Sequence, residues 1–493
     1  MLGKFIFCSA ANFIGINMKN AKFIYNAKLL DENINETGAV FILNGKIHSV
    51  IKTDFLSGKE AAAVAESFLH SEKSAELIDA QGLTLMPAFI DTHVHLRDPG
   101  QTQKEDLSSG LMAAAHGGYG TVVAMPNTNP VISERSQAEK IMERGESLGL
   151  THIFQSVSIT AGFDGKTTHH LDGLDRSRIP LITEDGHDVE SAAIMLEGME
   201  KAAKNQQIVS CHSEDCSLSA MAKHHREIAL ELMRKYGVSA CGKFTSSNVP
   251  EEVIKKINGE LMKANGILCL AEDLATERNI QLAKKAGCHI HICHISTKKS
   301  IESVRNAKTS ILETNTLSKN IGTWDSFSVT AEATPHHIAL TGDCEPWIRT
   351  LVNPPLRSEE DRLSVIQALK DGTIDCIATD HAPHTLEDKA MGAPGFTGLE
   401  VAYGVCNKFL VNDGHISSRK LSSLMSANPA RLLGLKKGLL NAGYEADLAL
   451  VAPLEEWSVD SSKFFSKGKA TPFDGMKLCG KVHSLFLSGR KIF

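Results

Sequence analysis

Short apolar segments, each the length of a buried β-strand, alternate with amphipathic stretches through the middle of the chain. Eight such segments occur, at 88–93, 121–125, 153–158, 180–183, 207–212, 289–294, 326–332 and 375–380. Strands that alternate with helices pair in parallel, so the pattern predicts a parallel sheet covered by helices. Eight such units favour a closed (β/α)8 TIM-like barrel in the α/β class, and a doubly wound open sheet is the alternative.

His93 and His95 stand at the end of the first segment, in the run Asp-Thr-His-Val-His. Alternate side chains of a strand point to the same face, so these two imidazoles project together. Two imidazoles on one face can hold one metal ion. The alternative is that they are ordinary histidines of a half-buried strand.

Other residues that can bind a metal also follow predicted strands. They are Glu184 and Asp185, His212, His294, and Asp380. In a (β/α)8 barrel the carboxyl ends of all the strands meet at one face, where active sites are built. Only a closed sheet would bring ligands from so many strands together, so this distribution favours the barrel over the open sheet.

The two ends of the chain consist of short strands and turns instead of strand–helix units. Asn44-Gly45 separates two apolar runs near the N-terminus, which is a hairpin signal. Because chain termini are often close in space, we expect both ends to form one small β-sandwich domain. The predicted division is an N-terminal extension at 1–20, the sandwich at 21–87 and 436–493, and a metal-dependent barrel at 88–435.

Composition and charge exclude several functions. A net charge of −6 over 493 residues gives no electrostatic case for nucleic-acid binding, and no apolar run is long enough to span a bilayer. Eleven cysteines without a CxxC pair fit reduced thiols, and the weakly apolar N-terminus lacks a convincing signal cleavage site, so we expect a cytoplasmic protein. Segments 216–272 and 308–326 are long for strand–helix links and predict surface insertions.

Ordered motifs run along the chain from residue 93 to residue 482. They are HVHLRDPG at 93–100, KED at 104–106, MPNTNP at 125–130, EDG at 184–186, CHSED at 211–215, HIST at 294–297, ATPHH at 333–337, NPPLR at 353–357, TDHAPH at 379–384, ANPARLLGL at 427–435 and TPFDGMKLCGKV at 471–482. Together they resemble the cyclic amidohydrolases and, among these, the type I dihydroorotases of bacteria. The resemblance covers nearly the whole chain after about residue 22.

This resemblance implies two Zn²⁺ ions per subunit, with Asp185 as the bridging ligand. The other implied ligands are His93, His95 and Asp380 for the first metal, and His212 and His294 for the second. Many amidohydrolases bridge their metals with a carboxylated lysine, but here the expected position reads Glu184-Asp185-Gly186. An aspartate bridge separates the type I dihydroorotases from hydantoinases and allantoinases. Glu184 is the rival for the bridging position.

The resemblance also implies the reaction, which is reversible hydrolysis of the cyclic amide of (S)-dihydroorotate to N-carbamoyl-L-aspartate in pyrimidine (UMP) biosynthesis. A hydroxide bridging the two metals would attack the ring carbonyl. The departing nitrogen needs a proton, so an acid–base group must stand within hydrogen-bond reach. Asp380 is the predicted catalytic residue, and the alternative is that it serves only as a ligand.

The substrate carries a carboxylate next to its ring, and five residues are predicted to bind it. Arg97 offers a planar fork that suits a carboxylate. His95, Asn127, Asn353 and His384 complete the predicted set. Asn127 and Asn353 are also explicable as turn or loop residues. By resemblance, the segment around Gly395 and Phe396 closes over the ring.

Two other functions remain open from the sequence. The chain resembles other cyclic amidohydrolases (hydantoinase, dihydropyrimidinase or allantoinase) in most motifs, although Arg97 and the aspartate bridge favour dihydroorotase. A non-catalytic homologue that scaffolds a transcarbamoylase is the third reading, and the presence of all six ligands argues against it. We expect a small-molecule substrate, no nucleic-acid or membrane partner, a homo-oligomer, and association with aspartate transcarbamoylase.

Overall fold

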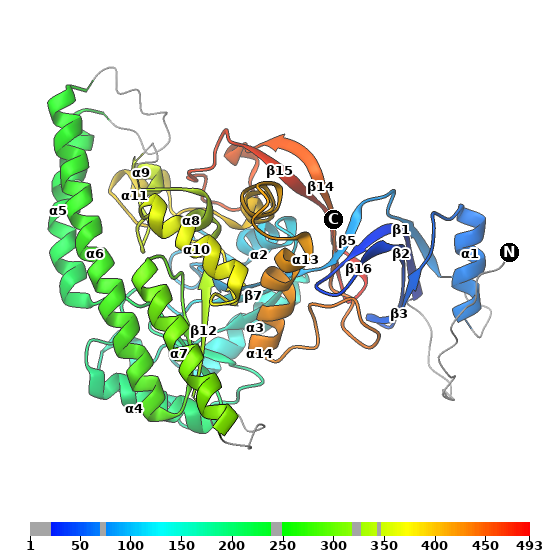
Figure 1. Cartoon of the computed structure of the whole chain (residues 1–493), viewed down its shortest axis with the longest axis horizontal. Helices are drawn as coiled ribbons and strands as arrows, with labels where there is room; N and C mark the ends of the chain where they lie inside the picture. Colours follow the sequence, from blue (N-terminus) through cyan, green and yellow to red (C-terminus); the bar gives the residue numbers. More distant parts are fainter. Residues whose placement is uncertain (1–20, 70–74, 238–248, 318–326, 343–346) are drawn as a thin grey trace.

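A computed structural model describes residues 21–69, 75–237, 249–317, 327–342 and 347–493 (Figure 1). The predicted N-terminal extension, 1–20, lies outside the described residues. No helix in these ranges is long and apolar enough to cross a membrane. A large α/β body carries a smaller sheet at one side, on the right in Figure 1.

The α/β body is built on eight parallel strands, one at each predicted position. In chain order they are β6 (Phe89–Val94), β7 (Tyr119–Ala124), β8 (His152–Gln155), β9 (Leu181–Thr183), β10 (Ile208–Cys211), β11 (His289–Ile292), β12 (Ser328–Ala333) and β13 (Cys376–Ile377). They form one run of three and one of five, each in sequence order. Parallel bridges Val157–Ile182 and Val94–His381 join the two runs at both ends. The sheet therefore closes into a barrel, and the open-sheet alternative is wrong.

Helices cover the outside of the barrel and bury their apolar faces against it. The longer ones are α2 (Leu107–His116), α3 (Arg135–Leu148), α4 (Ala192–Asn205), α5 (Cys216–Lys235), α6 (Glu251–Ala286), α7 (Lys298–Leu317) and α10 (Glu359–Asp371). Shorter helices are α8 (Pro335–Ala339), α9 (Trp347–Thr350), α11 (Leu386–Ala390), α12 (Ala402–Cys406), α13 (Ser418–Ser422) and α14 (Asn428–Leu433). Helical single turns and π-helical segments are η1 (Ala161–Phe163), η2 (His169–Leu171), η4 (Leu399–Val401), η5 (Asn407–Asn412), η6 (Ser423–Ala427) and η7 (Ser461–Lys463).

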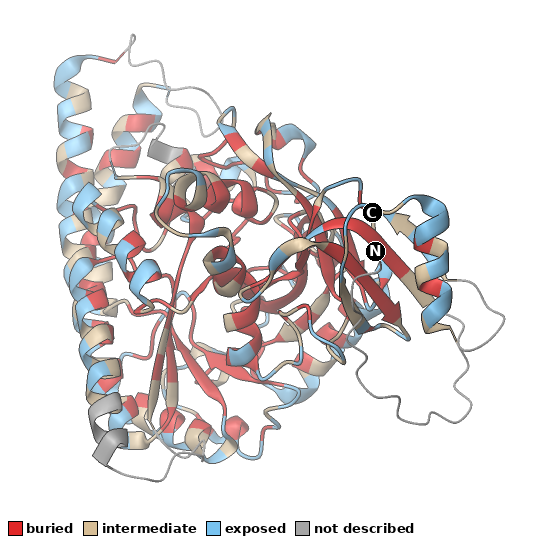
Figure 2. Ribbon diagram, turned by 45° about the vertical axis from the view of Figure 1, so that its right-hand side comes forward, coloured by how far each residue is buried: buried red, intermediate tan, exposed pale blue. Residues whose placement is uncertain are grey.

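Both ends of the chain form one separate sheet, as predicted. Its strands are β1 (Ala21–Leu30), β2 (Asn35–Leu43), β3 (Lys46–Lys52), β4 (Glu76–Asp79), β5 (Thr84–Pro87), β14 (Leu448–Ser458), β15 (Lys477–Leu487) and β16 (Arg490–Lys491). The order is β16-β15-β14-β5-β1-β2-β3, with β4 also paired to β1. Helix α1 (Gly58–Phe68) packs through Ala61 and Ala65 against Phe23 and Phe41. Most strands of the sheet and of the barrel are buried (Figure 2).

The predicted insertion 216–272 forms a long helical hairpin of α5 and most of α6, at the left edge of Figure 1. The two helices pack through buried residues such as Ala222, Ala264 and Leu268. Apolar residues of the same hairpin also bury Leu351, which belongs to the loop after α9. The hairpin therefore contacts the barrel loops and does not only project into solvent. The second predicted insertion, 308–326, lies partly in α7, and 318–326 falls outside the described residues.

Candidate metal centre

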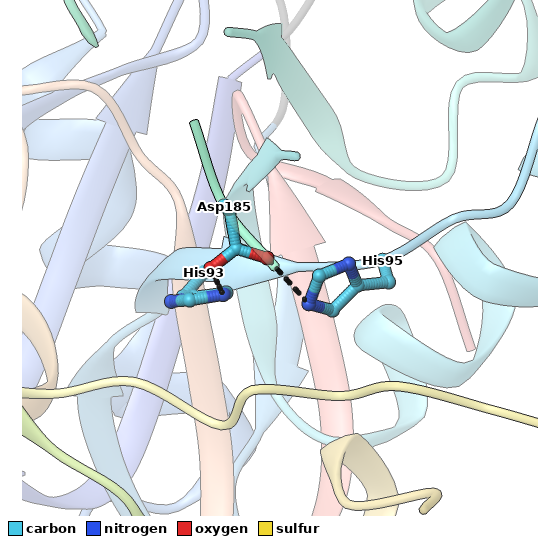
Figure 3. Close-up of side chains that lie close together, drawn as sticks. All are labelled: His93, His95 and Asp185. Atoms are coloured by element: carbon cyan, nitrogen blue, oxygen red, sulfur yellow. Dashed lines mark ion pairs between the residues drawn. The ribbon is translucent and has the colours of Figure 1, made fainter. Parts of the chain in front are cut away.

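Two histidines and one aspartate meet at the carboxyl-terminal face of the barrel (Figure 3). His93 Nε2 lies 3.2 Å from Asp185 Oδ1, and His95 Nε2 lies 3.4 Å from Asp185 Oδ2. All three side chains are buried. Figure 3 shows the carboxylate of Asp185 between the two imidazole rings. The pair His93 and His95 thus has an acidic partner placed to share a cation.

A second triad uses the same carboxylate. His212 Nδ1 lies 3.4 Å and His294 Nε2 lies 3.8 Å from Asp185 Oδ1. These two histidine nitrogens are 2.9 Å apart. Asp185, His212 and His294 form one possible metal group, and Asp185, His93 and His95 form another. Asp185 therefore belongs to both groups and is placed where a bridging ligand would be.

Asp380 borders the first triad. Its Oδ1 lies 3.1 Å from His95 Nε2 and 3.6 Å from His93 Nε2. Asp380 and His294 both adopt left-handed backbone conformations, with φ of +49° and +30°. Such conformations cost about 1–3 kcal/mol for a non-glycine residue and cluster at functional sites. The backbone turns at these two positions directly after β13 and β11, and the turns leave both side chains at the centre.

Unpartnered polar atoms show that these residues fit a metal. His93 Nε2 and Asp185 Oδ1 are buried and make no hydrogen bond with any described residue. Burying such atoms without a partner costs free energy, and a cation between them would satisfy both. Burial alone would raise the pKa of the Asp185 carboxyl, but the neighbouring imidazoles of His93, His212 and His294 hold that pKa well below its usual range. An ionised carboxylate among imidazoles is a donor set that suits Zn²⁺ and related divalent ions.

Glu332 fixes the orientation of His93. Its Oε1 accepts a hydrogen bond from His93 Nδ1 at 2.9 Å, and its Oε2 accepts one from His291 Nε2 at 3.0 Å. This contact directs His93 Nε2 towards Asp185, because a ligating imidazole is oriented by the partner of its other nitrogen. The sequence analysis did not assign Glu332 to the site. The available signal was its place at the end of the predicted strand 326–332.

Asn127 performs the equivalent task for His95. Its Oδ1 accepts a hydrogen bond from His95 Nδ1 at 2.9 Å, and its Nδ2 donates to Asp185 Oδ2 at 3.3 Å. The sequence suggested Asn127 as a substrate contact. In the structure its amide joins His95 to the shared carboxylate of Asp185. The side chain therefore lies at the centre, but its oxygen and its nitrogen are both already hydrogen-bonded to these two residues.

Glu184, the rival for the bridging position, lies in a different environment. Its Oε2 accepts hydrogen bonds from the backbone N–H groups of Ile159 (2.8 Å) and Thr160 (2.9 Å). Burial raises the pKa of its carboxyl to about 7. Glu184 therefore anchors the loop after β8, and Asp185 is the acid that meets the histidines.

Arg97 and His384 lie together beside the centre. Arg97 Nη2 is 3.3 Å from His384 Nε2, and Arg97 Nε donates to the carbonyl of Pro383 at 3.3 Å. Burial lowers the pKa of Arg97 only to about 10, so the guanidinium stays charged at neutral pH. Burial and the charge of Arg97 lower the pKa of His384 to about 2, so that imidazole is neutral. Within the described ranges Arg97 forms no ion pair, so a buried cation is available for an anionic group.

Asn353 lies in a neighbouring cavity of about 330 Å³ that Arg226, Leu351 and Pro394 also line. Its Oδ1 accepts a hydrogen bond of 2.5 Å from Arg226 Nη1 on α5. None of the four histidines of the two triads lines this cavity. The structure therefore brings the six predicted metal ligands together with Arg97, Asn127 and His384, and places Asn353 in the adjoining loop.

Comparison with known proteins gives one consistent result. A model of the Amidohydrolase family matches residues 84–492. The dihydroorotase of Clostridium botulinum (strain Eklund 17B / Type B) is 36% identical over 471 residues, which cover 95% of this chain and 98% of that protein. The dihydroorotase of Bacillus subtilis (strain 168) is 35% identical over 473 residues, with coverage of 95% and 97%.

Solved structures agree on the fold. An L-hydantoinase (dihydropyrimidinase) from Arthrobacter aurescens superposes with a TM-score of 0.73 at 21% identity, and the match covers 95% of each chain. A D-hydantoinase gives a TM-score of 0.72 at 20% identity, covering 96% of this chain and 95% of the other.

Proposed function

The chain belongs to the amidohydrolase family, and we propose that within it the protein is a dihydroorotase, a hydrolase that interconverts (S)-dihydroorotate and N-carbamoyl-L-aspartate. The observation that carries this proposal is the buried guanidinium of Arg97, which forms no ion pair among the described residues, beside two triads of possible metal ligands that share Asp185. The first feature suits an anionic substrate and the second suits hydrolysis of an amide. Relatives 35–36% identical over 95% of the chain bear the same name.

The carboxylate of the substrate is proposed to bind Arg97. A planar fork of N–H donors matches a carboxylate in two parallel hydrogen bonds. His384 lies next to Arg97, with its Nε2 3.3 Å from Arg97 Nη2. Because Arg97 follows His95 by two residues, binding the carboxylate there would set the ring next to the two triads.

The two triads are proposed to hold two Zn²⁺ ions per chain, with Asp185 shared between them. His93, His95 and Asp380 would bind the first ion, and His212 and His294 the second. Bound metal ions would lower the pKa of a water molecule and polarise the ring carbonyl. The protein would supply the orientation of these ligands through Glu332 and Asn127.

Asp380 is proposed to move the proton. Its Oδ1 lies beside the ligating nitrogens of His95 and His93, so it stands where water and substrate would meet. Opening of the ring requires removal of a proton from the attacking water and delivery of a proton to the departing nitrogen. An ionised carboxylate within hydrogen-bond reach can do both in turn.

A hydrolase of neutral rings is the second candidate, because the structural neighbours are named hydantoinase and dihydropyrimidinase. Arg97 argues against it, since a neutral ring would leave the buried guanidinium without an anion. The non-catalytic scaffold is disfavoured because all six ligands converge. A cytoplasmic location, a homo-oligomer and association with aspartate transcarbamoylase remain proposals based on the resemblance, and so do the domain boundaries.

A comparison of substrates tests the proposed function. We expect the zinc-loaded protein to turn over dihydroorotate with a kcat/KM at least about 100-fold higher than that for hydantoin or dihydrouracil, because a buried charged group left unpaired by the neutral rings costs several kcal/mol. Ring opening is followed in parallel for the three compounds at equal metal loading. A preference for either neutral ring would exclude dihydroorotase and support the second candidate.

A further inference from the structure

Lys389 in α11 is a fully buried lysine that the reaction as described does not use. Its exposed fraction is 0%. Its Nζ donates to the carbonyl oxygens of Leu351 (3.0 Å), Ala393 (2.8 Å) and Gly395 (2.8 Å). No ion pair between described residues includes it. All three N–H donors of the ammonium group are therefore hydrogen-bonded to backbone carbonyls of two separate loops.

These two loops contact the segment that carries His384, one of the residues proposed to bind the substrate. The carbonyl of Pro394 accepts a hydrogen bond from His384 Nε2 at 2.9 Å. The carbonyl of Phe396 accepts one from the backbone N–H of Ala382 at 3.0 Å, and the N–H of Gly395 donates to Leu351 at 2.9 Å. Hydrogen bonds thus join segment 393–396 to both 351–353 and 382–384, and Lys389 donates to the first two of these three segments.

The position of the 393–396 segment is tightly defined. Gly395 has φ of +110°, and a Cβ at this residue would lie 2.7 Å from the Cβ of Ala382. Only glycine allows this backbone to approach the loop that follows Asp380. The three bonds of Lys389 therefore hold a segment that has little room to shift.

A second cation holds the adjoining loop from the helical hairpin. Arg226 on α5 donates from Nη2 to the carbonyl of Val352 at 3.3 Å and from Nη1 to Asn353 Oδ1 at 2.5 Å. Burial, and then the charge of Arg226, lower the pKa of Lys389 to about 7. A methionine would fill a similar volume without the free-energy cost of burying an ammonium group. Ionisable groups whose pKa is strongly shifted by burial cluster at functional sites.

We propose that Lys389 is a positioning residue for the substrate: by tying 393–396 to Leu351, it holds His384 and Asn353 in the geometry that binds the dihydroorotate ring and its carboxylate. This inference rests on the proposed function. It assigns Lys389 no contact with the substrate and no proton transfer. Its effect should therefore appear in substrate binding, whereas the metal triads, which share none of its hydrogen bonds, should be unaffected.

The test compares Lys389→Met with Lys370→Met, an exposed lysine on α10. We expect K389M to raise KM for dihydroorotate at least about 10-fold with kcat changed less than about 3-fold, as for the loss of uniform binding. Zinc content should be unchanged. Amide hydrogen exchange should accelerate in residues 391–398 and stay the same in β10 to β12, whereas K370M should match the wild type in every measurement.

Each outcome decides the proposal. If wild-type protein does not turn over dihydroorotate, the proposed function fails and this inference falls with it. If wild-type protein is active and K389M has the same KM, or if kcat falls while KM is retained, only the positioning role of Lys389 is overturned. If K389M does not unfold cooperatively, K389Q, which keeps two of the donors, replaces it and should show an intermediate KM.

Discussion

Asp380→Asn should lower kcat for ring opening and ring closure by at least about 10³-fold, the scale of a lost acid–base group, while the protein still folds. The amide has the shape of the carboxylate but cannot accept the proton of the attacking water. Asp380 Oδ1 lies 3.1 Å from His95 Nε2, so the substitution also weakens a predicted ligand. Kinetics in both directions, zinc content and thermal unfolding measure these effects.

Asp413→Asn is the matched control, because Asp413 is exposed and belongs to neither triad. It should leave kcat and zinc content unchanged. Substantial activity in the Asp380→Asn protein with normal zinc content would contradict the role of Asp380. The proton would then have to pass through another group of the same loop, and His384 would be the first to examine.

Arg97→Ala should raise KM for dihydroorotate about 100-fold or more, because loss of one partner from a buried charge pair costs about 2–5 kcal/mol. Hydrolysis of a neutral ring such as hydantoin should change far less. Arg97→Lys keeps the charge but loses the planar fork of donors, so its KM for dihydroorotate should fall between those of the wild type and of Arg97→Ala. Michaelis–Menten kinetics with both rings separate these effects.

Arg135→Ala serves as the control for the loss of an arginine. Its side chain is 50% exposed and pairs with Glu139 on the same helix, α3. We expect its kinetics to match the wild type. If Arg97→Ala affected the charged and the neutral ring equally, Arg97 would have a structural role, and the main argument for an anionic substrate would be lost.

The sequence predicted the barrel because strand and helix periodicities alternate along it, and all eight strands lie where the apolar segments are. Two strand ends were predicted three residues too late: the strand predicted over 153–158 ends as β8 at Gln155, and the strand predicted over 375–380 ends as β13 at Ile377. Asp380 has φ of +49°, so the chain leaves the extended conformation there. The spacing of apolar residues along the sequence does not show where a strand ends in a turn at a polar residue such as Asp380.

The supporting residues of the centre could not be predicted in the same way. Glu332 meets His93 across 239 positions of sequence, and a contact of that kind follows only from closure of the barrel. Lys389 lies in a polar stretch that has the composition of a solvated helix turn, and its burial depends on the packing of three loops. The ligands themselves were accessible because strand ends and metal-binding residue types coincide in the sequence.

Titration of metal-free protein with Zn²⁺, with dihydroorotate depletion followed by ultraviolet absorbance, tests the central claim most directly. The two triads that share Asp185 predict no turnover without metal, a rise in rate as zinc is added, and saturation at two equivalents per chain. Full activity in the metal-free protein, saturation at one equivalent, or no depletion of dihydroorotate at any zinc ratio would contradict a two-metal dihydroorotase.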